Sequence, residues 1–209
     1  MVQTENWERH AASRPGASSS LVDGYFVAQH RRPAELSDVD TGALSPVLRG
    51  VLTSDGTVTT LIAACTMQPL ALRVLDERTV GLPAGTGTWL EAPPGAPATR
   101  RRVEITVRAT RAPVYHAETF LLRERLPPEV AGSLSTEPLG LGGALRRHGA
   151  NARRELLWYG QGGPPQWTQP PRLRAEASLP GGSTLHRTYR LMTPGGQPAA
   201  LITESFGLA

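Results

Sequence analysis

Six segments of the chain are predicted to be β-strands, at residues 70–77, 101–108, 114–122, 152–160, 184–192 and 197–207. The alternation of apolar and polar positions is clear in 101–108 and in the C-terminal segment. The second and third segments are joined by the short sequence ATRAP, and the last two by TPGG, so both pairs are predicted to form antiparallel hairpins. The strand pattern therefore predicts a mainly antiparallel sheet.

Helical spacing of apolar residues appears in two other regions. The first predicts helices over about 45–53 and 57–65, separated by the turn pair Asp55–Gly56, with Thr57 near the second N-cap. The second, residues 125–149, predicts two short helices separated by the sequence EPLG. The stretch 78–99 is rich in Gly and Pro and is predicted to be a loop. Helices inserted between hairpins indicate an α+β domain whose helices cover one face of the sheet.

The first 43 residues lack sustained apolar periodicity and contain many Pro, Gly, Ser and Asp residues. We predict an N-terminal arm over 1–43, partly flexible, and a single domain over 44–209. The short apolar piece LVDGYFVAQH within the arm can dock on the body as a strand or turn. A second long polar loop is predicted over 160–183.

The overall charge and composition exclude several classes of protein. The net charge is +4 and all 22 basic residues are arginine, which reflects a compositional bias more than a basic surface. The arginine clusters are short and are not interleaved with aromatic residues, so we expect no nucleic-acid partner. We also expect no membrane span, no signal peptide and a cytoplasmic location. The single cysteine, Cys65, is interpreted as a small buried helix residue.

Two charged residues fall on strand faces that are otherwise apolar. In the C-terminal sequence ALITESFGLA, Glu204 shares a face with Ile202 and Phe206. In the first hairpin, Arg101 shares a face with Val103 and Ile105. A buried charge is costly unless it is paired or hydrogen-bonded. The two residues therefore form an internal ion pair or serve a binding site, unless Glu204 lies at the frayed end of its strand and is solvated.

The motifs LTSDGTVTTLI, RRRVEITV with VYHAE, RLPP with TEPLG, ARRELLW and RTYRLMTPGGQPAALITESF occur in this order over residues 44–207. This set closely resembles the chorismate pyruvate-lyase family, and its actinobacterial branch in particular. The resemblance implies six antiparallel strands with helices on one side and a buried ligand cavity between them. It also implies a lyase that converts chorismate to 4-hydroxybenzoate and pyruvate without metal or organic cofactor.

The resemblance also implies roles for individual residues. Arg101, which fits the face pattern better than its neighbour Arg102, would hold the ring carboxylate, and Glu204 would contact the ring hydroxyl. Leu139 in EPLG and Val58 or Thr57 in the first helical region would contact the ligand. The sequence carries Glu118 where another branch of the family has a second arginine. Further substrate-binding candidates are therefore Arg102, Glu118, Arg154 and Arg187, the last two as sources of the missing positive charge.

Three functions are compatible with these observations. The first is a chorismate lyase, with the small-molecule substrate as its partner and a monomeric or homodimeric state. The second is an enzyme of the same fold recruited in secondary metabolism for a different carboxylated substrate, which Glu118 and the long loops favour. The third is a sensor of small aromatic acids that binds without turnover.

Overall fold

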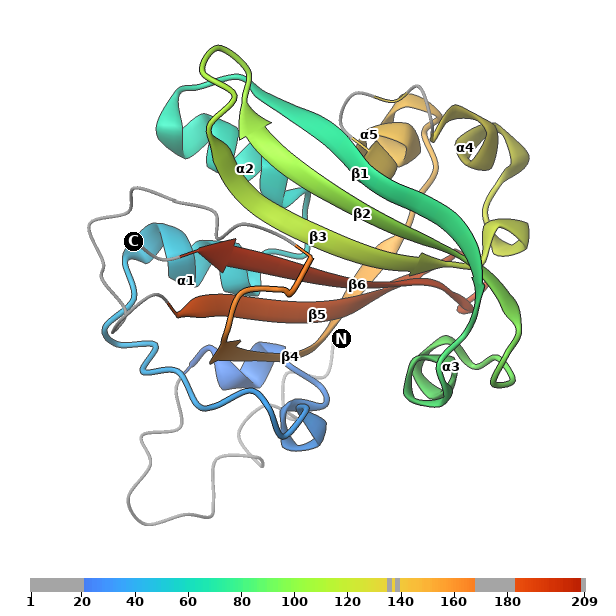
Figure 1. The fold of residues 1–209 in the computed structure, drawn as a ribbon, viewed down its shortest axis with the longest axis horizontal. Coiled ribbons are helices and arrows are strands. Elements are labelled where there is room, and N and C mark those ends of the chain that lie inside the picture. The colour runs from blue at the N-terminus through green and yellow to red at the C-terminus, as the bar shows by residue number, and fades with distance from the viewer. Residues whose placement is uncertain (1–20, 135–136, 138–139, 168–182, 208–209) are drawn as a thin grey trace, which may run out of the picture.

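The computed structural model describes residues 21–134, 137, 140–167 and 183–207 (Figure 1). Its centre is a six-stranded antiparallel sheet in the order β1-β2-β3-β6-β5-β4. The strands are β1 (Leu70–Gly81), β2 (Pro97–Val107), β3 (Pro113–Leu121), β4 (Arg153–Gly162), β5 (Thr184–Met192) and β6 (Pro198–Gly207). The predicted α+β class, the strand number and both hairpins are confirmed.

Five α-helices and three short 3-10 turns complete the described part of the chain. The helices are α1 (Pro46–Thr53), α2 (Val58–Thr66), α3 (Ala84–Leu90), α4 (Pro128–Ser133) and α5 (Gly140–Arg147). The turns are η2 (Asp23–Tyr25), η3 (Gln29–Arg31) and η4 (Arg123–Arg125). Within the described ranges, no helix is long and apolar enough to cross a membrane.

Helices α1, α2, α4 and α5 pack on one face of the sheet and enclose the larger apolar core. Leu52 and Ile62 from the helices are almost completely buried there, as is Phe206 from β6. Ser45 begins α1 by accepting a hydrogen bond from the Leu48 amide, as an N-cap residue should. The predicted helices at 45–53 and 57–65 therefore agree with α1 and α2 to within one residue.

The loop predicted over 78–99 is wrong in three places, because β1 continues to Gly81, α3 follows, and β2 already begins at Pro97. Helix α3 lies against the opposite face of the sheet and packs Leu90 in a second, smaller core with Leu157 and Leu201. Its interior is made of small residues with weak helix propensity. Tertiary contacts therefore decide its conformation, which the Gly and Pro content of the segment did not indicate.

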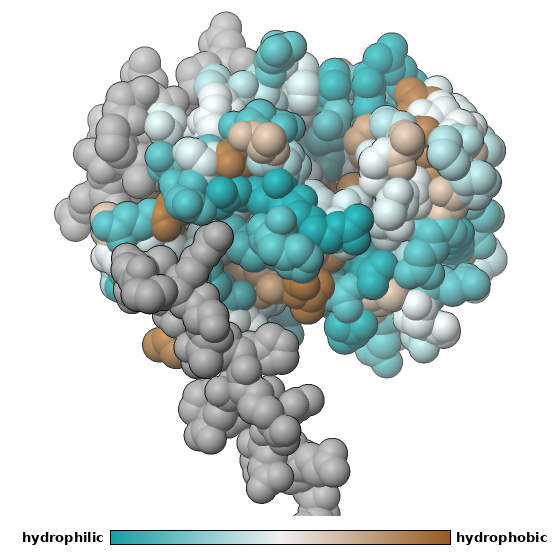
Figure 2. Space-filling view, turned by 90° about the horizontal axis from the view of Figure 1, so that it is seen from below, coloured by the Kyte–Doolittle hydropathy of each residue, from teal (hydrophilic) through white to brown (hydrophobic). Residues whose placement is uncertain are grey.

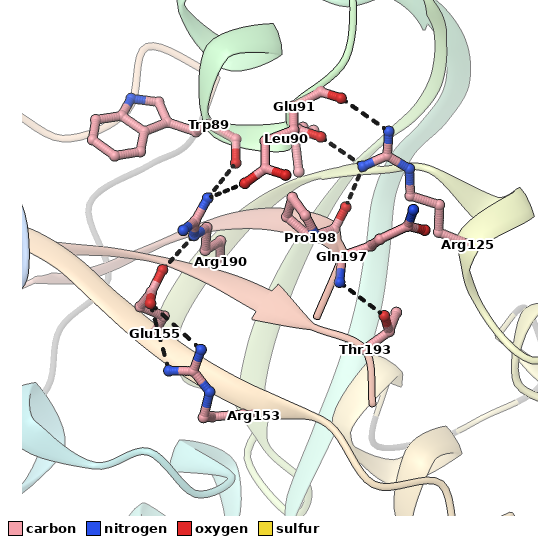
Figure 3. A network of polar contacts seen from close by, with 10 residues as sticks. All are labelled: Trp89, Leu90, Glu91, Arg125, Arg153, Glu155, Arg190, Thr193, Gln197 and Pro198. Atoms are coloured by element: carbon pink, nitrogen blue, oxygen red, sulfur yellow. Dashed lines mark hydrogen bonds and ion pairs between the residues drawn. The ribbon is translucent and has the colours of Figure 1, made fainter. Parts of the chain in front are cut away.

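Two arginines bind the C-terminal end of α3 and connect it to the strands (Figure 3). Arg125 donates to the carbonyl oxygens of Leu90 at 2.6 Å, Glu91 at 3.1 Å and Pro198 at 2.8 Å. Arg190 donates to the Trp89 carbonyl at 3.3 Å and also pairs with Glu155. The last carbonyls of a helix have no partner within the helix, and positive charge is favourable there.

The described part of the N-terminal arm, from residue 21 onward, packs against the edge strand β4. The Val27 and Ala28 amides donate to the carbonyl oxygens of Leu156 and Leu157, each at 2.9 Å. Phe26 is 7% exposed and lies against Tyr159, with ring centroids 4.8 Å apart. The segment therefore covers an edge of the sheet that would otherwise have unpaired backbone groups.

One further expectation is corrected. Cys65 is exposed, not buried, because it lies in the last turn of α2 on the side facing solvent. The view from below shows a surface on which hydrophilic residues predominate among the coloured atoms and hydrophobic residues form small patches (Figure 2).

Candidate functional site

A cavity of about 80 Å³ lies between the sheet and the helices α2 and α5. Its polar lining includes Arg101 from β2, Arg154 from β4 and Glu204 from β6. The remaining wall is mostly apolar, formed by Val103, Ile105, Leu134, Leu141, Leu191 and Ile202 among others. A small apolar space with a few convergent charged groups is the usual form of a ligand site.

The strand register places the two inward charges at a defined separation. Arg101 is opposite Thr119 of β3, and Thr119 is opposite Ile202 of β6, two residues before Glu204. Strands lie about 4.8 Å apart and residues advance about 3.4 Å, so the two Cα atoms are about 12 Å apart before allowing for sheet twist. Because both residues line the same cavity, a single ring between their side chains could contact both.

Arg101 is 6% exposed and has a carboxylate neighbour on β1. Its Nε lies 3.1 Å from Glu77 Oε2, which is an ion-pair distance. The contact is not oriented as a hydrogen bond, so the buried Nε has no hydrogen-bond acceptor among the described residues. Burial lowers the pKa of Arg101 below its usual value, Glu77 opposes this shift, and Arg123 adds to it. An anion in the cavity would supply the missing acceptor.

Glu204 is 6% exposed and is paired with Arg187, the residue directly opposite on β5. Arg187 Nε lies 2.6 Å from Glu204 Oε2. The other carboxylate oxygen accepts a hydrogen bond of 3.2 Å from the Tyr189 hydroxyl. An internal ion pair between Arg101 and Glu204 is therefore not formed, because each of the two has a different partner.

Arg187 is completely buried and does not line the cavity. Burial acts to lower its pKa, but the nearby Glu204 carboxylate outweighs this, so the pKa of Arg187 lies above its usual value. Its Nη1 donates to the carbonyl oxygens of Val51, Leu52 and Ser54, at the end of α1. Arg187 thus connects Glu204 to the turn between α1 and α2.

The two buried tyrosines of the cavity are protonated donors. Burial, reinforced by Glu204, raises the pKa of Tyr189 well above its usual value, against the lowering effects of Arg154 and Arg187. Burial also raises the pKa of Tyr115, whose hydroxyl lies 2.7 Å from Thr59 Oγ1. The cavity wall near Glu204 therefore carries the hydroxyl groups of these tyrosines. Among the described lining residues, Glu204 is the only one with a carboxylate.

Arg154 and two helix N-termini add positive potential to the cavity. Arg154 Nη1 donates to the Asp55 carbonyl at 2.9 Å, and its guanidinium lies 5.9 Å from the centre of the Tyr189 ring. Thr57, Val58 and Thr59 at the start of α2 line the cavity, as do Gly140 and Gly142 at the start of α5. The Thr57 side chain makes no capping hydrogen bond. The first amides of a helix have no partner within it, and they attract anions.

The residues singled out from sequence fall into three groups. Arg101, Glu204, Arg154, Thr57 and Val58 line the cavity, and Arg187 lies directly behind Glu204. Arg102 and Glu118 lie on the opposite face of the sheet, where they pair with each other at 2.7 Å. Leu139 lies outside the described residues.

Several lining residues were not anticipated from the sequence. Tyr115 and Tyr189 are the most prominent, together with the glycines at the start of α5. The alternation of β5 places Tyr189 on the same face as Arg187, so strand parity was the signal that could have identified it. The alternation of β3 likewise places Tyr115 on the same face as Ala117, Thr119 and Leu121, which also line the cavity.

Comparison with known proteins establishes the fold. No protein-family model matches the chain, and a search of curated proteins finds no relative. The effector domain of PhnF from Mycobacterium smegmatis is similar with a TM-score of 0.52 and 12% identity, over 74% of this chain and 90% of that domain. The structure of PhnF from the same organism gives a TM-score of 0.53 and 13% identity, over 74% and 64% of the two chains.

A ligand-binding domain of a putative GntR-family transcriptional regulator from Bordetella bronchiseptica gives a TM-score of 0.46 and 16% identity, over 66% of this chain and 89% of that one. The two structures with TM-scores above 0.5, at 12% and 13% identity, show a shared fold and nothing more.

Proposed function

We propose that this chain binds a small cyclic monocarboxylic acid in the cavity between the sheet and helices α2 and α5, and that it acts as a ligand sensor without turnover. The carboxylate lies at Arg101. The opposite end of the ring lies at Glu204.

The observation that carries this proposal is the position of Arg101 on the cavity wall, with a buried Nε that contacts Glu77 as an ion pair but has no hydrogen-bond acceptor among the described residues. A buried guanidinium donor without an acceptor costs free energy in the empty protein, and a bound carboxylate removes that cost. Arg154 and the start of α2 also line the cavity, but their contacts are with Tyr189 and Tyr115, on the side of Glu204. Arg101 is therefore the cationic lining residue at the other end, and a single carboxylate is the group that it fits best.

The small size of the cavity, about 80 Å³, is more compatible with a single carboxylated ring than with chorismate. Chorismate carries an enolpyruvyl group in addition to its ring, so it needs more room than a cyclic acid without that group.

The shared fold also supports ligand binding over turnover. The solved structure from Mycobacterium smegmatis with which this chain shares its fold is described as an effector domain. We therefore infer that the chain responds to a ligand. It is a small-molecule-binding protein under this proposal, and nucleic-acid binding would require a further element.

Chorismate lyase activity is the second candidate, because Arg101 and Glu204 line one cavity, as the sequence resemblance implies. In that reaction, Arg101 would orient the ring carboxylate and Glu204 would contact the ring hydroxyl while pyruvate leaves. Aromatisation of the ring drives the elimination, so the residues would act mainly by positioning.

One pair of measurements decides between the two. Calorimetric titration of the purified chain with 4-hydroxybenzoate is expected to show saturable binding, and incubation with chorismate is expected to leave it unconverted. If chorismate is converted to 4-hydroxybenzoate and pyruvate, and the conversion is lost in Arg101→Ala, the sensor hypothesis is rejected in favour of a chorismate lyase. If neither binding nor conversion occurs, both candidates fail and a different carboxylated substrate becomes the better hypothesis.

A further inference from the structure

Glu204 is held from behind by a charged residue that a cavity ligand does not need to touch. Arg187 is 0% exposed, and its Nε lies 2.6 Å from Glu204 Oε2. Its Nη1 is occupied by carbonyl oxygens at the end of α1, including Ser54 at 2.9 Å. These contacts fix the guanidinium in one place, and the guanidinium in turn fixes the carboxylate.

The ion pair with Arg187 determines whether Glu204 accepts or donates hydrogen bonds in the cavity. Arginine stays protonated even when buried, and a carboxylate this close to it is an acceptor with no proton to donate. One Glu204 oxygen receives Arg187 and the other receives the Tyr189 hydroxyl at 3.2 Å. A carboxylate has about four lone-pair sites, so acceptor capacity remains for a ligand.

We propose that Arg187 is a positioning residue that sets the ligand specificity of the cavity: by holding Glu204 as a fixed, ionised acceptor, it selects acids that carry a hydroxyl or amino donor opposite the carboxylate. This inference rests on the proposed function and narrows its ligand class. A bare ring would leave Glu204 without a ligand donor, and a second carboxylate would place two negative charges together.

The register supports the arrangement of the two groups on the ring. Arg101 and Glu204 lie two strands and two residues apart, which gives about 12 Å between Cα atoms in a flat ladder. Both side chains extend into the same cavity, so they approach a ligand from opposite ends. A donor directly opposite the carboxylate reaches Glu204, whereas a donor adjacent to the carboxylate does not.

A binding panel tests the specificity. The probes are 4-hydroxybenzoate, 4-aminobenzoate, benzoate and terephthalate, each titrated by calorimetry against the wild type. We expect the two donor-bearing acids to bind about tenfold or more tightly than benzoate, and terephthalate to bind weakest. Equal affinities for all four acids would overturn the proposal.

Three variants connect the preference to Arg187. Arg187→Lys retains a buried cation and is expected to keep the preference, with weaker binding. The double variant Arg187→Met with Glu204→Gln removes both charges and therefore avoids leaving a carboxylate unpaired; it is expected to lose the preference, because an amide donates as well as accepts. Arg190→Lys, on the same strand but at the α3 contact, is the matched control and should match the wild type. A retained preference in the double variant would contradict the role of the Arg187–Glu204 pair, and a lost preference in Arg187→Lys would contradict the role of a buried cation at this position.

A second measurement does not depend on any ligand. The carboxyl carbon of Glu204, identified by its loss in Glu204→Gln, is followed by 13C NMR at neutral pH in protein without ligand. In the wild type and in Arg187→Lys, the carboxyl carbon is expected to have the chemical shift of an ionised carboxylate. In Arg187→Met, the chemical shift is expected to move toward that of a protonated carboxyl group. A protonated Glu204 in the wild type, or no change in Arg187→Met, would overturn the inference. Failure of all four acids to bind, with the expected NMR result, would instead refute the proposed function alone.

Discussion

Two buried arginines of the sheet, Arg101 and Arg187, have different roles because their hydrogen-bond partners differ. Arg187 has a carboxylate at 2.6 Å and carbonyl oxygens on Nη1, whereas the buried Nε of Arg101 has only an ion-pair contact with Glu77. Arg187 Nη2 and Arg101 Nε both lack a hydrogen-bond partner among the described residues, but of the two arginines only Arg101 lines the cavity. Of these two residues, Arg101 is therefore the one whose positive charge is available to a ligand.

Replacing Arg101 by alanine is expected to weaken 4-hydroxybenzoate binding about tenfold or more, because a charge-assisted hydrogen bond contributes about 1.5–3 kcal/mol. The change should not leave its neighbour unpaired, since Glu77 keeps Arg123 at 2.5 Å. Arg102→Ala is the control, because Arg102 pairs with Glu118 on the opposite face. Calorimetric titration of both variants measures the difference, and equal losses would remove Arg101 from the site.

Helix α3 shows how the elements of the fold depend on contacts that are distant in sequence. Its helix is short and weak in propensity, yet Leu90 is completely buried and two arginines bind its last carbonyls (Figure 3). Arg125 and Arg190 come from the segment after β3 and from β5, far along the chain. A single isolated stretch of sequence could not indicate that these arginines would stabilise a helix.

Arg125→Ala is expected to lower the free energy of unfolding by about 2 kcal/mol, because three carbonyl oxygens lose a charged donor. Arg153→Ala serves as the control. Arg153 is mostly exposed and lies 3.5 Å from Glu155, a distance at which a surface ion pair contributes less than about 1 kcal/mol. Urea unfolding measures both changes. Similar values for the two variants would show that the α3 contact contributes no more than a surface pair.

The strands and helices α1 and α2 were predictable because their apolar periodicity is strong and local. That Arg101 and Glu204 lie on the apolar face of the sheet also followed from strand parity alone, since successive side chains of a strand point to opposite faces. Their partners were not predictable, because Glu77 and Arg187 come from neighbouring strands whose register depends on the folded sheet. Placing Tyr115 against Thr59 likewise required the packing of α2 on the sheet.

At the scale of the whole molecule, the segment from residue 21 to 43 belongs to the folded body. Its backbone pairs with β4, and its apolar side chains enter the larger core. The 1–43 and 44–209 division remains a prediction, and residues 1–20 lie outside the described part. The edge strand β4 is thereby covered by the same chain.

Phe26→Ala is expected to reduce the free energy of unfolding by about 3 kcal/mol, because a buried aromatic ring leaves a cavity against Tyr159. Tyr25→Ala, next to it and 60% exposed, should change stability by less than about 0.5 kcal/mol. Urea unfolding of both variants provides the comparison. An equally small effect of Phe26→Ala would mean that the segment is not part of the cooperative unit.

Two buried histidines predict the pH dependence of stability. Burial lowers the pKa of His186, opposed by the Gly163 carbonyl, and burial lowers that of His116, opposed by Glu104. The unfolded chain therefore takes up these protons first, so stability is full above about pH 6.5 and falls as the pH drops below it. Urea unfolding at pH 7 and pH 5 should show this loss.

His186→Gln should make the same decrease shallower, while His148→Gln, at an exposed position, should leave it unchanged. A decrease of the same size in His186→Gln would contradict a neutral, buried His186.

The central claim is that a small monocarboxylic acid lies between Arg101 and Glu204, and a crystal structure of the chain with 4-hydroxybenzoate tests it most directly. The account predicts the carboxylate on the Nε side of Arg101 and the hydroxyl donating to Glu204, with Glu204 still paired to Arg187. A ligand in the reverse orientation, a ligand elsewhere on the protein, or an empty cavity at saturating concentration would contradict it.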